Sequence, residues 1–164
     1  MPLILPSLQT ELVNIYDPGR KGNPTADLVG INTGKAYVNY VSAGINAGGG
    51  AFTNMAGGSA LGDDLARILN KIPTPSGDIT AANLATAYDK CLATWLSVHQ
   101  TTIVTAPGKG GLTFELMDLL SAPKGAAGLY ATALGRALHN YTLAAIVIGV
   151  IPDTPGIPFT GPIS

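Results

Sequence analysis

Few residues of this 164-residue chain combine the types and spacings that a chemical site requires. The segment 30–36, Gly-Ile-Asn-Thr-Gly-Lys-Ala, partly matches a phosphate-binding loop. Such a loop holds phosphate with backbone N–H groups and a lysine, and it needs four residues between its glycines and a Ser or Thr after the lysine. Here three residues separate the glycines, and Ala36 follows the lysine. Because the segment also has a helical pattern, we expect Lys35 to be an ordinary helical lysine.

The thiol and the two imidazoles are not spaced for a catalytic or metal site. Cys91 and His99 fall on one predicted helix, where eight residues at a rise of about 1.5 Å separate them by about 12 Å. A nucleophile and its base need to lie about 3 Å apart. His99 and His139 are both expected near helix C-termini, where a partial positive charge is favourable. No third ligand at a suitable spacing accompanies them.

The adjacent acids Asp63 and Asp64 are expected in the first turn of a helix, where negative charge complements the helix dipole. Neighbouring residues on a helix point in different directions, which argues against an acid–base pair. Trp95 and Tyr88 are expected in the core, because no Arg or Lys is interleaved with the aromatic residues to form a surface for bases. We therefore predict no catalytic, cofactor-binding or metal-binding residue, and a protein that is not an enzyme.

Composition excludes further classes of protein. Nine basic and ten acidic residues give a net charge of −1, and charged residues make up 12% of the chain, against about a quarter in a typical domain. Neither a nucleic-acid partner nor a disulfide framework is predicted, since there is no basic excess and Cys91 is the single cysteine. The longest apolar run, 143–151, is too short for a membrane helix of about 20 residues. A chain that is 46% apolar and nearly neutral is expected to associate with other proteins.

The elements that position these residues are predicted to be mostly helices. Apolar residues at spacings of three and four indicate six helices, of which the fourth runs to Val98 and the last spans about 124–141. Residues 100–105 and 142–151 have the composition of strands, and 107–111 is expected to be a turn. The helix N-caps are expected at Ser7, Asn23, Ser59, Thr80 and Thr113. The residues expected in the core are Leu84, Tyr88, Cys91, Trp95, Tyr130 and Leu134.

Three glycines stand out in the second predicted helix. Gly30, Gly34 and Gly44 each weaken a helix by about 1 kcal/mol relative to Ala. Their presence is better explained if another backbone approaches this helix closely. The inner face of the same helix is expected to carry Ile31, Val38, Val41 and Ile45.

These patterns predict an α+β fold that is mostly helical, with about five or six helices packed on two short strands. A weak internal similarity relates 98–103 to 138–143 at an offset of 40 residues. Both segments are predicted corners between a helix and a strand, and they would place two strands side by side beneath the helices. We expect a single helix-rich domain, 1–151, followed by an extended Pro-rich C-terminal arm, 152–164.

The expected arm has four prolines and two glycines, and its one charge is Asp153. It retains three large apolar residues, Ile157, Phe159 and Ile163, whereas disordered tails are usually polar and charged. An ordered arm needs a surface to lie against. That surface is either the arm's own domain or a neighbouring subunit. We favour the neighbouring subunit and expect these three residues at a subunit interface.

With these features in place, the chain resembles small structural proteins of tailed bacteriophage virions. The similarity lies in an N-terminal helix with Leu-Gln-Thr-Glu-Leu at 8–12, and in Pro-Thr-Ala-Asp at 24–27 opening a Gly/Ala-rich helix. Two further Ala-rich helices run into strands, at 95–104 and 137–150, and a Pro-rich segment follows. The resemblance implies assembly with other virion proteins, and with copies of the same chain, in a ring or lattice. It also implies a location in the virion after synthesis in the host cytoplasm.

The function expected from this resemblance is that of a structural subunit in the head–tail neck or tail. A capsid decoration (cement) protein is the alternative within the same class. A soluble adaptor that binds a single host protein is the alternative from another class, and it would be a monomer with a movable tail. A small hydrolase would instead require a polar pocket with a cluster of titratable residues.

Overall fold

The computed structural model describes residues 3–17, 19, 25–71, 75–104, 106–121, 126–152 and 155–164. Over these residues it confirms a mostly helical α+β fold with six helices and short antiparallel strands. The helices are α1 (Leu5–Tyr16), α3 (Ala26–Ser42), α4 (Gly58–Leu69), α5 (Gly77–Leu92), α6 (Ala106–Ser121) and α7 (Ala127–Leu143). The strands are β1 (Phe52–Met55), β2 (Trp95–Ser97), β3 (Gln100–Val104), β4 (Ile146–Ile151) and β5 (Ile157–Pro162).

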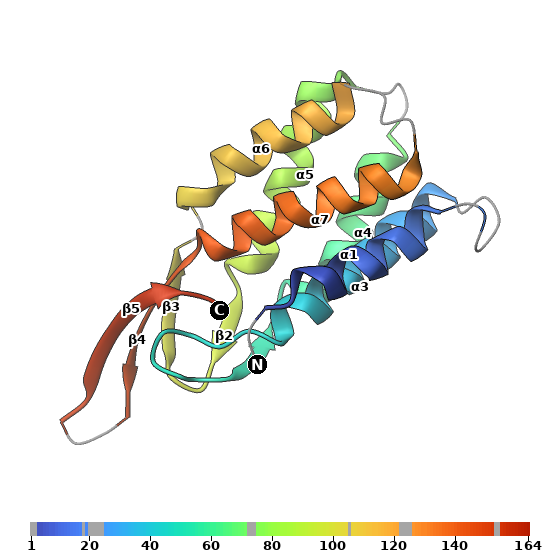
Figure 1. Cartoon of the computed structure of the whole chain (residues 1–164). Coiled ribbons are helices and arrows are strands. Elements are labelled where there is room, and N and C mark those ends of the chain that lie inside the picture. The colour runs from blue at the N-terminus through green and yellow to red at the C-terminus, as the bar shows by residue number, and fades with distance from the viewer. Residues whose placement is uncertain are drawn as a thin grey trace.

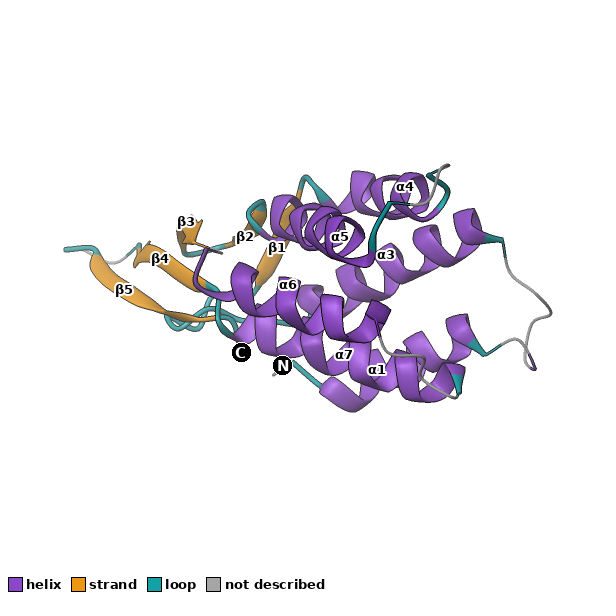
Figure 2. Ribbon diagram, turned by 90° about the horizontal axis from the view of Figure 1, so that it is seen from above, coloured by secondary structure: helices purple, strands orange, loops and turns teal. Residues whose placement is uncertain are grey.

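The six helices form a closed ring. Each one packs against the next described helix along the chain, and α7 packs against α1 to close the circle (Figure 1). The interior is apolar and aromatic, with the rings of Tyr37 and Tyr88 meeting edge to face at 5.0 Å. Figure 2 shows the strands gathered at one end of the helices, so the molecule has a helical body and a strand-bearing end.

The closest approach between helices is that of α3 and α4, and it depends on glycine. A Cβ atom added at Gly34 would lie 2.7 Å from the Cα of Gly62, and one added at Gly30 would lie 2.5 Å from the Cα of Ala66. Side chains cannot be accommodated at such separations, so the two backbones are in direct contact. The prediction that another backbone approaches the second helix is confirmed. Of the predicted inner face, Val41 is buried, Ile31 and Val38 are only half-buried, and Ile45 lies beyond the end of α3 at Ser42, while Ala36 and Tyr37 are buried instead.

The strands form two small antiparallel sheets, β1–β2 and β3–β4–β5. The two predicted strands do lie side by side, because β3 pairs with β4. The second one begins at Ile146 rather than at residue 142, since α7 continues to Leu143. Strands β1, β2 and β5 are additions to the predicted pair.

Several predicted helix boundaries are wrong. The N-cap of α3 is Thr25, whose side chain accepts a hydrogen bond from the Leu28 N–H, while Asn23 lies outside the described residues. Thr80 lies inside α5, which begins at Gly77, and α5 ends at Leu92 instead of Val98. Neither Ser7 nor Ser59 serves as an N-cap, because those positions are held by Ile4 and Gly57.

Helix α6 begins at Ala106, so the turn predicted at 107–111 and the N-cap predicted at Thr113 are also wrong. A proline is tolerated in the first turn of a helix, where its missing N–H has no partner to lose. Gly108 has a structural role there, because a Cβ on it would lie 2.9 Å from the Tyr141 carbonyl oxygen of α7. The apparent turn sequence is therefore a helix start that packs closely on its neighbour.

The predicted core residues are placed as follows. Leu84, Tyr88, Cys91, Trp95 and Leu134 are buried, and Tyr130 is half-buried and packs against the core. Trp95 belongs to β2 rather than to a helix. Its indole Nε1–H donates a hydrogen bond to the Val41 carbonyl oxygen at 2.9 Å. That bond satisfies one of the last carbonyls of α3, which have no partner within the helix.

Substituting Gly34→Ala is expected to destabilise the protein, although alanine favours a helix by about 1 kcal/mol. The new methyl group would force α3 and α4 apart, and the expected net loss in the free energy of unfolding is about 1–3 kcal/mol. Urea denaturation measures it. The matched control is Gly111→Ala in α6, where an added Cβ meets no atom within 4 Å. The control is expected to stabilise the protein by about 0.5–1 kcal/mol, and equal effects of the two substitutions would contradict the close backbone contact.

Candidate functional site

The strand-bearing end of the molecule has no charged side chain in its described residues. It is formed by four segments, 43–57, 93–104, 144–152 and 155–164, and we call it the strand end. None of these segments contains Asp, Glu, Lys or Arg. The one charged residue that interrupts them, Asp153, lies outside the described part of the chain. Among the described residues, all the charged ones belong to other segments of the chain.

The strand end also exposes large apolar side chains. Five of them are between 40% and 60% exposed, namely Leu96, Val98, Ile148, Val150 and Ile157. Single exposed apolar residues are common on soluble proteins and need no explanation. Five in a region without charge are a different observation, because interaction surfaces are often apolar. Ile148 and Val150 share one face of their sheet, whereas Ile157 lies opposite Ile151 and therefore on the other face.

The exposure on β4 follows from its alternation and register. Val147 and Gly149 face the domain and are buried, while Ile148 and Val150 face outward. Directly opposed residues share a face of an antiparallel sheet. Ile148 lies opposite Thr102 of β3 and Thr160 of β5, and Val150 lies opposite Pro158. The outward face of this sheet therefore presents aliphatic, hydroxyl and proline side chains.

Glycine and two backbone hydrogen bonds hold the β4–β5 hairpin against the body. The ring of Phe159 and the carbonyl oxygen of His99 lie so close to Gly149 that no side chain fits there. The Ile163 side chain fills the space beside Gly44, where an added Cβ would lie 2.5 Å from its Cγ2. Ser164 and Ile45 exchange two N–H···O bonds of 2.9 Å each.

The predicted C-terminal arm is therefore part of the domain. Residues 157–162 form β5, paired along its length with β4, so the boundary predicted at residue 152 divides a single hairpin. Ile163 is fully buried in the chain's own core and Phe159 is half-buried against it, which makes neither a free contact for another subunit. Ile157 is 52% exposed and remains available. The apolar residues of a Pro-rich segment were correctly expected to need a surface, and that surface is the chain itself.

A small hydrogen-bonded cluster fixes the loops of the strand end. Asn46 donates from Nδ2 to the Ser97 Oγ at 2.5 Å and accepts from the Gly50 N–H at 2.8 Å. His99 lies in the turn between β2 and β3 rather than near a helix C-terminus. Its backbone N–H donates to the same Ser97 oxygen at 3.4 Å. The buried Nδ1 of His99 has no hydrogen-bond partner among the described residues. These contacts join the loop after α3 to β2 and the turn that follows it.

The residues considered for chemistry are dispersed across the structure. Lys35 is an exposed residue in the middle of α3, as predicted, and Gly30 and Gly34 contact α4 instead of forming a loop. Cys91 is buried beside the Met55 sulfur at 3.6 Å, and burial raises the pKa of its thiol to about 12. The thiol is therefore protonated at neutral pH and is a poor nucleophile.

The prediction that Asp63 and Asp64 lie in the first turn of a helix is wrong, because α4 begins at Gly58 and its first turn has no acidic residue. Asp63 is exposed, whereas Asp64 accepts from Arg67 at 2.6 Å on the same helix. His139 lies in α7, where its Nδ1 forms a hydrogen bond with the Tyr40 hydroxyl of α3. His99 belongs to the strand end, so the two histidines lie in different parts of the fold.

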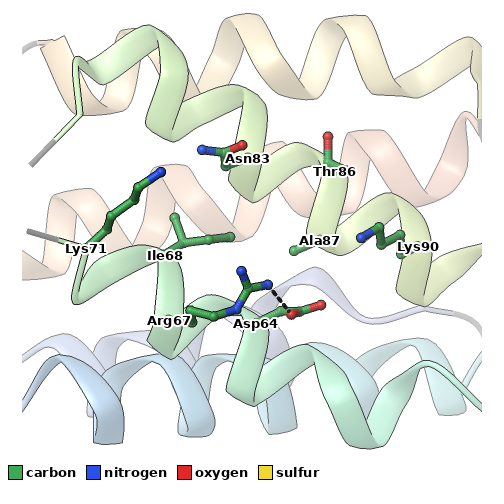
Figure 3. A pocket seen from close by; sticks show the side chains of 8 residues that line it. All are labelled: Asp64, Arg67, Ile68, Lys71, Asn83, Thr86, Ala87 and Lys90. Carbon is green, nitrogen blue, oxygen red and sulfur yellow. Dashed lines mark hydrogen bonds and ion pairs between the residues drawn. The ribbon is translucent and has the colours of Figure 1, made fainter.

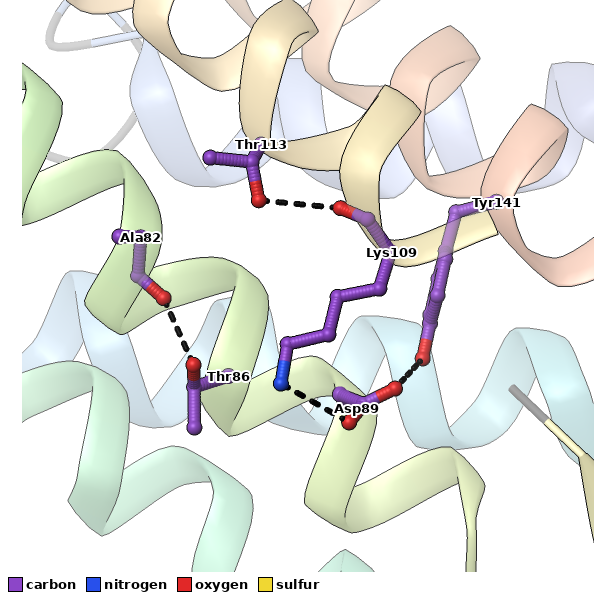
Figure 4. Close-up of polar contacts among 6 residues, drawn as sticks. All are labelled: Ala82, Thr86, Asp89, Lys109, Thr113 and Tyr141. Atoms are coloured by element: carbon purple, nitrogen blue, oxygen red, sulfur yellow. Dashed lines mark hydrogen bonds and ion pairs between the residues drawn. The ribbon is translucent and has the colours of Figure 1, made fainter. Parts of the chain in front are cut away.

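A polar cluster links α5, α6 and α7 (Figure 4). The Asp89 carboxylate accepts from the Lys109 Nζ at 3.2 Å and from the Tyr141 hydroxyl at 3.1 Å. Each partner comes from a different helix, and Asp89 is partly shielded from solvent. The carboxylate is held by an ammonium group and a hydroxyl from two other helices, so the cluster fits a structural role in joining the three helices.

Across the described ranges, no group of three or more His, Cys, Asp or Glu side chains is arranged to hold a metal ion. None of the helices built from those same residues combines the length and apolarity needed to cross a membrane. Comparison with models of protein families, with curated proteins and with solved structures found no match for this chain.

Stability is expected to fall as the pH drops below about 6.5, and His139 is expected to contribute to the fall. Burial lowers the pKa of His139 below its ordinary value of 6.5, so the unfolded chain takes up the proton first. The stabilising effect of a neutral His139 is complete above that pH and is lost toward the lower pKa of the folded state. Urea denaturation at several pH values should show that the free energy of unfolding decreases less on acidification for His139→Asn than for the unmodified protein. Identical pH profiles would contradict this assignment.

Proposed function

We propose that this protein is a structural subunit of a tailed-phage virion, in the head–tail neck or tail, and that copies of it join through the strand end. The observation that carries the proposal is the coincidence of five exposed aliphatic side chains with a region that has no charge in its described residues. The placement in a virion rests on the sequence resemblance described above. The mode of association rests on the chemistry of the surface.

A surface of this kind gains stability when it is removed from water. Burying apolar area contributes about 25 cal/mol per Å², and an interface without charges has no unpaired ion to desolvate. The centres of protein interfaces are depleted of charged residues in the same way. The partner must also lack charge at the contact, and another copy of the chain carries such a surface. For this reason the proposal names a second copy as the partner.

The distribution of charge would restrict association to one end of the subunit. The helical body carries the charged residues of the described chain, which favour contact with water. A subunit whose charges lie on the body and not at the strand end forms a defined contact rather than an indiscriminate aggregate. This property suits a subunit that must occupy a fixed place in a larger assembly.

Prolines in β5 favour side-chain packing over extension of the sheet. β5 is an edge strand of its sheet and contains Pro158 and Pro162. A proline has no N–H to donate, and prolines at edge strands discourage the addition of a further strand. The contact between copies is therefore assigned to the outward face of the sheet, where Ile148 and Val150 lie.

The proposed contact can be tested with point substitutions. The double variant Ile148→Glu, Val150→Glu places two charges on the outward face without altering the buried face of β4. Sedimentation equilibrium should give an oligomer for the unmodified protein and a folded monomer for the double variant. Leu129→Glu is the control, because Leu129 is 63% exposed on α7 and lies outside the strand end. It should leave the oligomer unchanged.

A monomeric unmodified protein at all concentrations would overturn self-association through the strand end. Equal dissociation of the control would show that any added charge disperses the oligomer, and it would also overturn the assignment. Deleting residues 152–164 is a poorer test, because it removes β5 and leaves the space of Ile163 empty in the core. Circular dichroism of each variant shows whether the fold is retained.

The virion placement has a separate test. Particles purified from the phage that encodes this sequence should contain the chain, and quantitative mass spectrometry should find several copies of it in each particle. Its absence from purified particles would overturn the placement, whatever the oligomeric state of the isolated protein.

A further inference from the structure

A polar groove runs between α4 and α5 on the helical body (Figure 3). It encloses about 570 Å³, which is within the range of about 300–1,000 Å³ of small-molecule sites. Only Ile68 and Ala87 contribute aliphatic side chains to it. The residues that line the groove are Asp64, Arg67, Ile68, Lys71, Asn83, Thr86, Ala87 and Lys90.

The groove is positively charged, although the whole chain has a net charge of −1. Three cations line it, against the single carboxylate of Asp64, and that carboxylate is paired with Arg67 at 2.6 Å. Lys71 and Lys90 have no ion-pair partner within 4.0 Å among the described residues. Since the one carboxylate of the lining is paired with Arg67, a bound anion would meet an excess of positive charge.

The two lysines mark opposite ends of the groove. Lys71 follows the end of α4 and its ammonium group lies on the same side as the Asn83 amide, whereas Lys90 lies near the other end, beside Asp64 (Figure 3). Seven residues separate Asp64 from Lys71, which corresponds to about 10 Å along a helix. A ligand with a single anionic group would reach only one of these ends.

We infer that the groove binds a small ligand that carries several phosphate groups in a row. Lysine binds phosphate as a compact positive charge, and the guanidinium of Arg67 has five N–H donors, of which the contact with Asp64 uses only part. The Asn83 amide supplies a neutral donor at the Lys71 end. Ile68 and Ala87 are the only aliphatic residues of the lining, so we expect charge rather than apolar contact to determine which ligand is held. No residue of the groove belongs to the strand end, and the inference is therefore independent of the proposed function.

Isothermal titration calorimetry of the full chain with tripolyphosphate tests this inference. Saturable binding is expected at low ionic strength, and it should weaken as NaCl rises from about 50 to about 200 mM, because exposed charges are screened. The double variant Lys71→Met, Lys90→Met should bind at least about tenfold more weakly, since methionine keeps the length of the side chain and removes its charge. The control is Lys35→Met on α3, an exposed lysine outside the groove, which should bind as the unmodified protein does.

Further ligands in the same experiment separate the possible sources of phosphate. ATP that binds as tightly as tripolyphosphate would show that the phosphate chain alone is recognised, and tighter binding of ATP would assign the site to nucleotides. Orthophosphate should bind more weakly, because it reaches one end only. Citrate that binds as tightly as tripolyphosphate would overturn the assignment to phosphate. The absence of saturable binding by tripolyphosphate, or an equal loss in Lys35→Met, would overturn the site altogether.

Discussion

The direct backbone contact between α3 and α4 is the constraint from which the arrangement of the other elements follows. Gly30 and Gly34 let α3 lie against Gly62 and Ala66. With this pair fixed, the short connection through β1 must leave α3 at one end and return to α4 at the same end. The Val41 carbonyl at the end of α3 then receives the indole of Trp95, which positions β2 beside β1. The strand end is thus located by the packing of two helices.

The same physical principle recurs wherever two parts of the backbone meet. Gly108 allows α6 to approach α7, Gly135 of α7 faces Gln9 of α1, and Gly149 lies under the His99 carbonyl. Each glycine weakens its own helix or strand, and the loss is offset by contacts that a larger residue would prevent. A high glycine content is often associated with flexibility, but in this chain many of the glycines are positions of tight packing.

The fold class and most of the core could be predicted because they follow from local periodicity. The pairing of two strands followed instead from the similarity between 98–103 and 138–143. Prediction from the sequence failed at helix starts such as Ala106, where a proline and several glycines have the composition of a turn but pack as a helix. It extended α5 to Val98, since the spacing that leads to Trp95 continues by coincidence into a strand.

The exposed row of Ile148 and Val150 was also missed. Which face of a strand is exposed depends on its partners, and β5 was interpreted as an arm. The lack of charge in four separate segments was visible in the sequence, but only folding brings those segments together.

The closure of the helical ring by α1 and α7 has a consequence for the order of events during synthesis. The apolar stripe of Leu8 and Leu12 leaves the ribosome before α7, the helix that covers it, has been made. The hairpin of β4 and β5 is translated after α7, and it completes the strand end. A nascent chain therefore has no finished strand end while its helices are still unpaired. If copies join through the strand end as proposed, this order of synthesis would let the core close before association begins.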